Sequence, residues 1–224
     1  MLKKRRLRAA MVLILLLAVS AIGFSWQSER TPEYAMKQLM EGMRTRNSRQ
    51  VELYADVSSL IETSYDAGTN LLAERIQELQ REYPQDWFFR HDTAFMRNYI
   101  ADRRDEDILF IHQILVFYMD PDMTPISRMD GQARWAADEI EQFETNYTVR
   151  LGEVRRHGTE ATAALEIRGR DTDYGRLVPQ LTAKIRLRRQ ADGHWQAVSV
   201  DNVDELFAPV VRGVEDYWTL QGWQ

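Results

Sequence analysis

Four histidines are the residues of this sequence best suited to acid–base or metal chemistry, and their spacing limits what they can do. No interval between them matches the HxH or HExxH patterns that bring two imidazoles to one metal ion, so the sequence encodes no local zinc site. His112 lies in an apolar helical run, where a nearby Asp or Glu would make its imidazole a general base. A hydrogen-bonded histidine of the core is the preferred interpretation, so we expect no catalytic residue and keep His112 as the one candidate. The four are His91, His112, His157 and His194.

Metal and cofactor sites find little support elsewhere in the chain. The sequence contains no cysteine, which excludes disulfides, thiolate metal sites and cysteine nucleophiles. Asp120, Asp122 and Asp130 resemble a calcium-binding loop only superficially, because Pro125 stands where that loop requires glycine. We therefore expect no cofactor.

A cationic strand face is the second candidate site. Lys184, Arg186 and Arg188 alternate with apolar residues and so project from one side of a strand. Their neighbours across the ladder, depending on register, are the candidates Arg150, Arg168 and Arg170. Such a face would suit an anionic envelope polymer or lipid headgroups. The preferred alternative is a solvated sheet face paired with acidic helices.

Three adjacent aromatic residues form the third candidate. Trp87, Phe88 and Phe89 cannot all lie on one face of a regular element, so some of them reach a core or a groove. One hypothesis is a ligand pocket formed by these aromatics with His112, and core packing is the favoured alternative.

Charge is distributed unevenly along the chain, whose net charge is −5. The first eight residues hold five cations, residues 25–146 hold 13 basic and 23 acidic residues, and residues 147–203 hold 10 basic and 7 acidic residues. The region preceding the strands is therefore strongly acidic. Phosphate contacts need concentrated positive charge, so we expect no nucleic-acid partner.

The N-terminus predicts a membrane anchor. Five cations precede the uncharged stretch from Ala9 to Phe24, which is the pattern of a secretory or anchor signal. We expect an uncleaved anchor through residues 7–26, with the N-terminus cytoplasmic and the rest of the chain outside. Secretion after cleavage is the alternative. The domains expected are thus an anchor at 1–27 and an extracytoplasmic domain at 28–224.

Helical periodicity dominates from residue 28 to residue 146. Thr31 and Pro32 predict a capped first helix, a short helix follows near residue 48, and residues 60–83 predict one or two helices with Gly68 as the weak point. A helix capped by Asp92 comes next. Beyond the charged residues 102–107, the run from Ile108 to Met119 is apolar almost all round, which predicts a central helix buried on the sheet, with a buried strand as the weaker alternative. A further helix spans about residues 132–144.

Residues 147–202 predict four antiparallel strands in a meander. Apolar residues occupy every second position of residues 161–167 and 181–187, as a sheet with one buried face requires. Turn signals lie at His157-Gly158, at residues 171–175 and at Asp192-Gly193, and the fourth strand is expected at residues 195–203. A closing helix with Leu206 and Trp218 completes an α+β fold.

These residues carry a resemblance to a known family. Thr31-Pro32-Glu33-Tyr34-Ala35 through Arg46-Asn47, followed by Tyr54-Ala55-Asp56-Val57 and Tyr65-Asp66, resembles the opening of an uncharacterised bacterial family of membrane-anchored proteins. That family has a nuclear-transport-factor-like (NTF2-like, cystatin-like) domain. The resemblance implies a cone-shaped α+β domain and supplies no catalytic residues.

The function expected is that of an extracytoplasmic binding or interaction module for an envelope protein or a small apolar ligand. The alternatives are an isomerase- or hydratase-like enzyme that uses the pocket of the cone, or a structural spacer. We expect the site on the cationic face, or in the concavity where the sheet meets the helix at residues 108–119.

Overall fold

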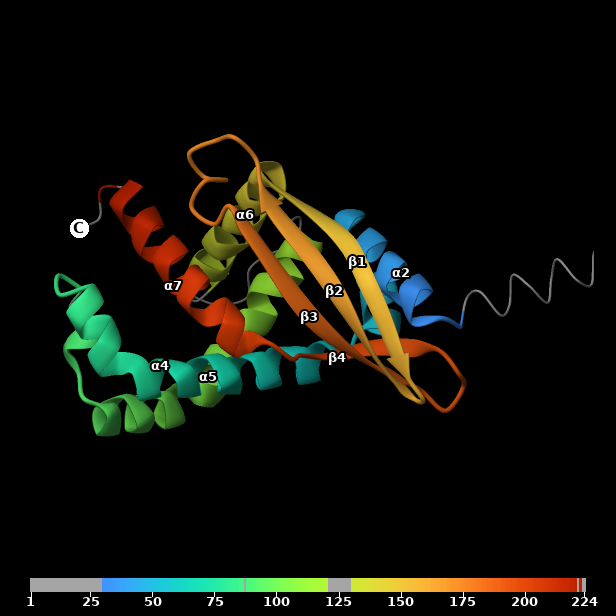
Figure 1. The fold of residues 1–224 in the computed structure, drawn as a ribbon, viewed down its shortest axis with the longest axis horizontal. Helices are drawn as coiled ribbons and strands as arrows, with labels where there is room; N and C mark the ends of the chain where they lie inside the picture. Colours follow the sequence, from blue (N-terminus) through green and yellow to red (C-terminus); the bar gives the residue numbers. More distant parts are fainter. Residues whose placement is uncertain (1–29, 87, 121–129, 221, 223–224) are drawn as a thin grey trace, which may run out of the picture.

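The structure is a computed structural model that describes residues 30–86, 88–120, 130–220 and 222. Its fold is α+β, with helices first, then a four-stranded antiparallel sheet and a C-terminal helix (Figure 1). The elements are α2 (Pro32–Arg44), α3 (Ser48–Tyr54), α4 (Val57–Glu82), η1 (Phe88–Arg90), α5 (Thr93–Met119), α6 (Asp130–Asn146), β1 (Tyr147–His157), β2 (Glu160–Gly169), β3 (Gln180–Arg189), β4 (Trp195–Val200) and α7 (Val203–Leu220).

The predicted helix starts are confirmed by their caps. The hydroxyl of Thr31 accepts a hydrogen bond from the backbone N–H of Tyr34 at 3.2 Å, and Pro32 opens the helix. Asn47 caps α3 and Asp92 caps α5 in the same way. Each cap satisfies a backbone donor that the first turn of a helix leaves without an intrahelical partner.

The sheet has the predicted meander order β1-β2-β3-β4. Ala163 lies opposite Ile185 in the β2–β3 register, and both are buried, whereas the next pair, Ala164 and Lys184, turns to the other face. Strand β4 ends at Val200, earlier than expected. Beyond it, the side chain of Asn202 binds the backbone of β3: it accepts a hydrogen bond from the N–H of Lys184 and donates one to the carbonyl of Thr182.

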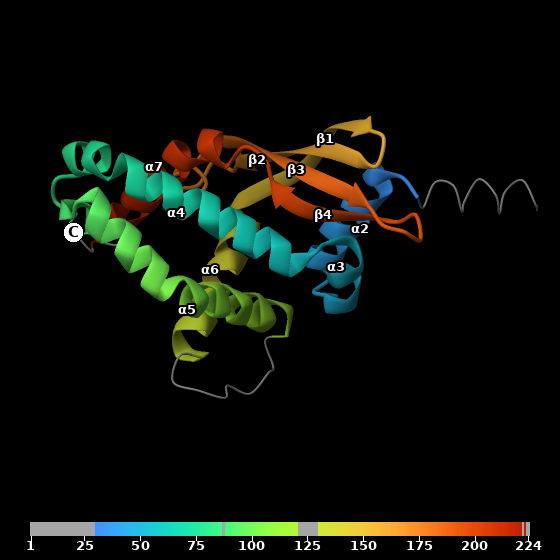
Figure 2. The ribbon, with the colours of Figure 1, turned by 90° about the horizontal axis from the view of Figure 1, so that it is seen from below.

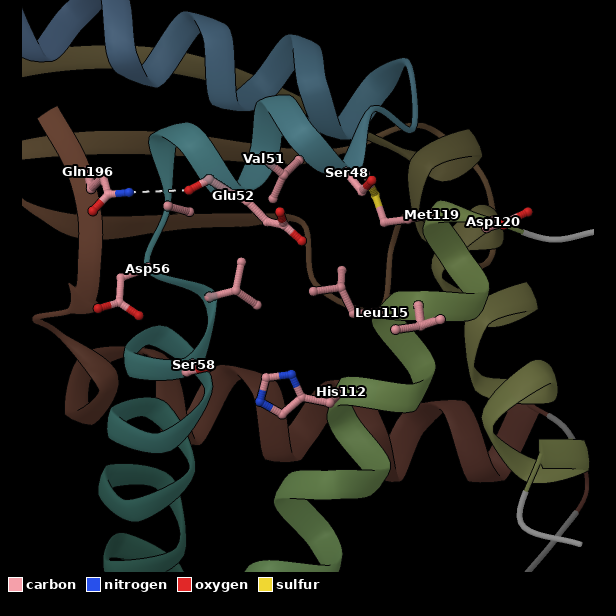
Figure 3. Close-up of a pocket in the computed structure, with 13 residues that line it drawn as sticks. Ser48, Val51, Glu52, Asp56, Ser58, His112, Leu115, Met119, Asp120 and Gln196 are labelled. Carbon is pink, nitrogen blue, oxygen red and sulfur yellow. Dashed lines mark hydrogen bonds between the residues drawn. The ribbon is translucent and has the colours of Figure 1, made fainter. Parts of the chain in front are cut away.

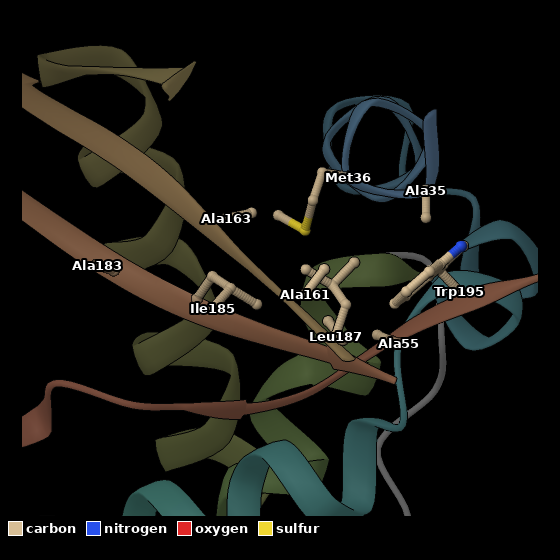
Figure 4. Packing of buried hydrophobic residues seen from close by; sticks show 10 residues of the cluster. Ala35, Met36, Ala55, Ala161, Ala163, Ala183, Ile185, Leu187 and Trp195 are labelled. Atoms are coloured by element: carbon tan, nitrogen blue, oxygen red, sulfur yellow. The ribbon is translucent and has the colours of Figure 1, made fainter. Parts of the chain in front are cut away.

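The buried face of the sheet is covered by α2 and α4. Met36 of α2, Leu187 of β3 and Trp195 of β4 are almost completely buried there (Figure 4). The indole N–H of Trp195 donates to the carbonyl of Arg30 at 3.0 Å, so the largest core side chain also holds the start of the described chain. We call the buried apolar cluster that contains Met36, Leu187 and Trp195 the sheet core.

Helices α4 and α5 form a long antiparallel hairpin that extends away from the sheet (Figure 2). Gly68 does not interrupt α4, which is one helix. A second apolar cluster closes the far end of the hairpin, and we call it the hairpin core. Its buried members are Ala73, Ile76, Leu79, Phe89 and Met96.

The prediction of a central helix at residues 108–119, buried on the sheet, is wrong. These residues are the second half of α5, which is continuous through the charged interval and packs on α4 and α6. Leu109 and Val116 are 55% and 45% exposed, while Phe117 and Tyr118 are buried beside Met43 and Ile140. Apolar residues 108–119 occur on several sides of α5 because one side packs on α4 and another on α6. A third part of this surface faces solvent.

The predicted anchor at residues 7–26 lies outside the described residues. Among the helices of the described part, none combines the length and apolar character needed to cross a membrane.

A candidate binding cleft between α3, α4 and α5

A cleft of about 700 Å³ lies where α3, the first turn of α4 and the last turns of α5 meet (Figure 3). The sheet contributes one lining residue, Gln196 of β4. His112 is among the lining residues, so the candidate histidine does face a cavity. The apolar walls are formed by Val51, Ala55, Val57, Leu115, Val116 and Met119, and the polar ones by Ser48, Glu52, Asp56, Ser58, His112, Asp120 and Gln196.

The cleft exists because α4 and α5 separate toward the sheet. Nearer the far end of the hairpin, the phenol of Tyr65 donates to Asp107 at 2.8 Å, and Arg104 donates two hydrogen bonds to Asp66 at 2.8 and 2.9 Å. The Arg104 guanidinium also holds the pKa of Asp66 below its ordinary value. Beyond these contacts the two helices diverge, and α3 lies across the opening between them (Figure 2).

Asp56 is a structural residue of this cleft. One of its carboxylate oxygens accepts from the N–H of Ser59 at 3.1 Å, and the other accepts from the Ser59 hydroxyl at 2.8 Å. Its own N–H donates to the carbonyl of Ala197 at 2.8 Å, which ties the start of α4 to the sheet. Both oxygens therefore serve the cap of α4, and little of the carboxylate is left for proton transfer.

Gln196 fixes the position of α3 against the sheet. Its side-chain amide donates to the main-chain carbonyls of Glu52 and Leu53, each at 3.2 Å. The carboxylate of Glu52 is left to point from α3 into the cleft (Figure 3). This side chain has no hydrogen bond or ion pair to a described residue.

His112 points from α5 toward α4 across the cleft (Figure 3). It makes no hydrogen bond to a described residue, so the structure shows no pair of the His112 imidazole with a described carboxylate. No group of three or more metal-ligating side chains occurs in the described part of the chain. The arrangement is suited to holding a ligand and lacks a positioned pair for moving a proton.

Of the aromatic residues in the hypothesised pocket with His112, Phe88 and Phe89 lie in the hairpin core and do not line the cleft that His112 faces. Phe89 is 5% exposed in the hairpin core, with Phe88 packed against that core. Their rings contact each other at a centroid distance of 6.0 Å. Trp87 lies outside the described residues. The favoured alternative, core packing, is confirmed for Phe88 and Phe89.

On the sheet, the predicted cations face carboxylates. Lys184 pairs with Glu205 of α7 at 2.7 Å, Arg186 with Asp201 at 3.0 Å, and Arg168 with Glu166 at 3.5 Å. The register also sets Arg150 opposite Glu166 and Arg188 opposite Glu160. Arg170 follows the end of β2, and its N–H donates to the carbonyl of Asn146. The cationic face is therefore largely compensated by acidic neighbours.

Sequence reasoning missed the side of the cleft formed by α3. Val51 and Glu52 are consecutive residues of a seven-residue helix, and nothing in their sequence pattern predicts a binding site. The one usable signal was Asp56, whose spacing to Ser59 is that of a helix cap and so predicts a break between two helices.

Comparisons with known proteins assign this chain to no family. No family model matches the sequence, and no curated protein matches it. A solved de novo designed protein with a curved β-sheet is 15% identical; the match covers 32% of this chain and 60% of that protein, with a TM-score of 0.21. A second solved chain, named Rd1NTF2_05 and carrying five substitutions, is 14% identical over 45% of this chain and 97% of its own length, with a TM-score of 0.22. Likeness at these TM-scores carries no argument about fold or function.

Proposed function

We propose that this chain is a membrane-anchored extracytoplasmic binding module that holds an apolar part of a ligand or envelope protein in the cleft between α3, α4 and α5. The observation that carries the proposal is the cleft itself. Its volume of about 700 Å³ lies in the range of ligand sites, and its walls combine apolar side chains with a few polar groups.

The anchor and the fold family belong to the same proposal. The five N-terminal cations and the uncharged stretch after them support an anchor at residues 7–26, with the domain outside the cytoplasm. An NTF2-like domain is supported by the order of the elements and by α2 and α4 covering one face of the sheet.

An isomerase- or hydratase-like activity has less support. General acid–base catalysis needs a group within hydrogen-bond reach of the proton it moves and with a suitable pKa. Asp56 is occupied by the cap of α4, and His112 has no hydrogen bond to a described carboxylate. A binding role needs neither condition.

A neutral apolar probe tests whether the cleft accepts apolar groups. The full chain, carrying methyl-labelled methionines and held in zwitterionic lipid nanodiscs, is titrated with 1-hexanol and observed by NMR. Because Met119 lines the cleft, its methyl signal should shift and saturate. Met96, which is completely buried in the hairpin core, should keep its signal.

A matched pair of variants locates the probe. Val116→Arg places a charge at a cleft wall and should weaken hexanol binding roughly tenfold or more, because a charge beside an apolar ligand is costly. Val214→Arg makes the same change on α7, at a residue exposed to 44% compared with 45% for Val116, and should leave the titration unchanged. If Met119 does not respond to hexanol, or if both variants act alike, the cleft is not a binding site for apolar groups.

A further inference from the structure

We infer that the occupant of the cleft is a segment of a partner protein in which a Lys or Arg side chain stands beside apolar side chains. The inference rests on the proposed function, since it names the chemistry of the partner for the same cleft. It follows from the charge of the cleft and from the extent of the apolar surface at its edge.

The described lining of the cleft is acidic. Among the described residues, its lining includes three carboxylates, Glu52, Asp56 and Asp120, and no Lys or Arg. Asp56 is committed to its cap, and Asp120 points outward, whereas Glu52 points into the cleft without a described partner (Figure 3). Glu52 is therefore the group that an incoming cation would meet.

The surroundings reinforce this preference. The region at residues 25–146, which supplies every lining residue except Gln196, holds 13 basic and 23 acidic residues. A surface of one sign attracts ligands of the opposite sign and repels those of its own. An anionic ligand is thus disfavoured at Glu52 and by the net negative charge of the region that forms the cleft.

Apolar surface continues out of the cleft along α5. Leu109, His112 and Val116 are spaced three and four residues apart, so they share one face of the helix. Leu109 and Val116 are 55% and 45% exposed, the former lying beyond the cleft. A small ligand confined to the cleft would leave Leu109 in water, whereas a chain lying along α5 covers both residues, as peptides do in apolar grooves.

The test uses three short peptides of Leu and Ala that differ only in carrying Lys, Gln or Glu at the remaining positions. Because the chain has no cysteine, Ser48→Cys gives one attachment site at the cleft for an environment-sensitive dye. The full chain is held in zwitterionic nanodiscs, and empty nanodiscs correct for binding to lipid. We expect saturable binding of the Lys peptide, weaker binding of the Gln peptide and none of the Glu peptide.

Charge variants identify the recognition residue. Glu52→Gln should weaken binding of the Lys peptide about twofold to fivefold, which is the effect of losing an exposed charge pair. Glu78→Gln removes the same charge from an exposed position of α4 outside the cleft and should change nothing. Glu52→Lys should reverse the order of the Lys and Glu peptides.

The outcomes separate this inference from the proposed function. Equal binding of the three peptides, or equal effects of Glu52→Gln and Glu78→Gln, would overturn the cationic partner and leave the hexanol response of Met119 intact. Competition by hexylammonium as strong as that of the Lys peptide would assign the cleft to a small amine and overturn the protein segment. Loss of the hexanol response would remove the proposed function itself.

Discussion

Carboxylates at two positions of this molecule show how a residue's neighbours decide its role. Asp56 accepts hydrogen bonds from Ser59 through both of its carboxylate oxygens and acts as a structural cap at the start of α4. Glu215 of α7 faces another carboxyl group, Asp86, on the turn after α4. Burial, together with the charge and hydrogen bond of Asp86, raises the pKa of Glu215 to about 7. The first carboxyl group stabilises the fold as a hydrogen-bond acceptor, and the second does so when it is protonated.

The pH dependence at Glu215 follows from this direction of shift. A folded-state pKa of about 7, above the ordinary 4.5, means that the folded chain binds the proton more tightly than the unfolded chain. The stabilisation of the folded state by protonated Glu215 is complete below pH 4.5 and is lost as the pH rises through about 7. We expect Glu215→Gln to raise stability above pH 7 by about 1 kcal/mol, a value discounted for solvent screening, and to change little near pH 4.

Chemical denaturation of the full chain at several pH values measures this effect. Glu78→Gln, at an exposed carboxylate of α4, serves as the control for the change of residue type. A constant difference between Glu215→Gln and the parent chain across the pH range would contradict the assignment.

At the scale of elements, α5 combines two packing environments in one helix. Its first half carries Met96 into the hairpin core, and its second half sets Phe117 and Tyr118 against α6 and the end of α2. The Tyr118 hydroxyl donates to the carbonyl of Met43 at 3.3 Å and hydrogen bonds with Glu144, so three helices meet at one side chain. Tyr118 thus ties the end of α5, next to the lining residue Met119, to α6 and α2.

Two helical glycines predict opposite effects of the same substitution. A Cβ added at Gly68 of α4 meets no atom within 4 Å, so Gly68→Ala should stabilise the chain by up to about 1 kcal/mol through helix propensity. A Cβ at Gly213 of α7 would come within 2.5 Å of the Val178 side chain. Gly213→Ala should therefore destabilise by about 1–3 kcal/mol, since a β-branched neighbour cannot turn aside freely.

Thermal unfolding of the single and double variants checks this pair. Val178→Ala removes the obstructing methyl group, so Gly213→Ala should cost less in that background. If both glycine substitutions stabilise, the close approach of α7 to the loop between β2 and β3 is not a constraint.

On the scale of the whole molecule, the sheet core and the hairpin core are bridged by α4. The first turns of α4 pack against the sheet core through Val57 and Leu60, and its last turns supply Ile76 and Leu79 to the hairpin core. Helix α7 contacts both β3 and α4 and so adds a second connection. The cleft lies at the end of the hairpin next to the sheet, away from the hairpin core.

Hydrogen exchange should distinguish the two cores. Met36 in the sheet core and Met96 in the hairpin core are both completely buried, and truncating a buried methionine to alanine costs about 2–5 kcal/mol. We expect Met96→Ala to accelerate exchange at the far end of α4 and the start of α5 while β2 and β3 stay protected. Met36→Ala should accelerate exchange in the sheet. Uniform acceleration by Met96→Ala would show that the molecule opens as one unit.

Much of the architecture was predictable from local patterns. The strand alternation at residues 161–167 and 181–187 and the cap at Thr31 are decided within a few residues, so they could be identified without tertiary information. The charged residues 102–107, which separate the helix capped by Asp92 from the apolar run at 108–119 in the sequence, are part of one helix, in which Arg104 and Asp107 have partners on α4, across the hairpin. A charged stretch whose partners are remote in sequence looks like a linker.

The sequence by itself determined the order of helices and strands, the faces of the sheet, and an acidic helical region that precedes a mildly basic sheet. These features follow from periodicity and composition, which act over short stretches of chain. Only the tertiary structure decided that His112 faces a cleft with Glu52, that Phe88 and Phe89 belong to a different core, and that the sheet cations meet carboxylates. Those facts depend on how α3, α4 and α5 diverge and on strand register, and both are set by contacts between residues far apart in the sequence.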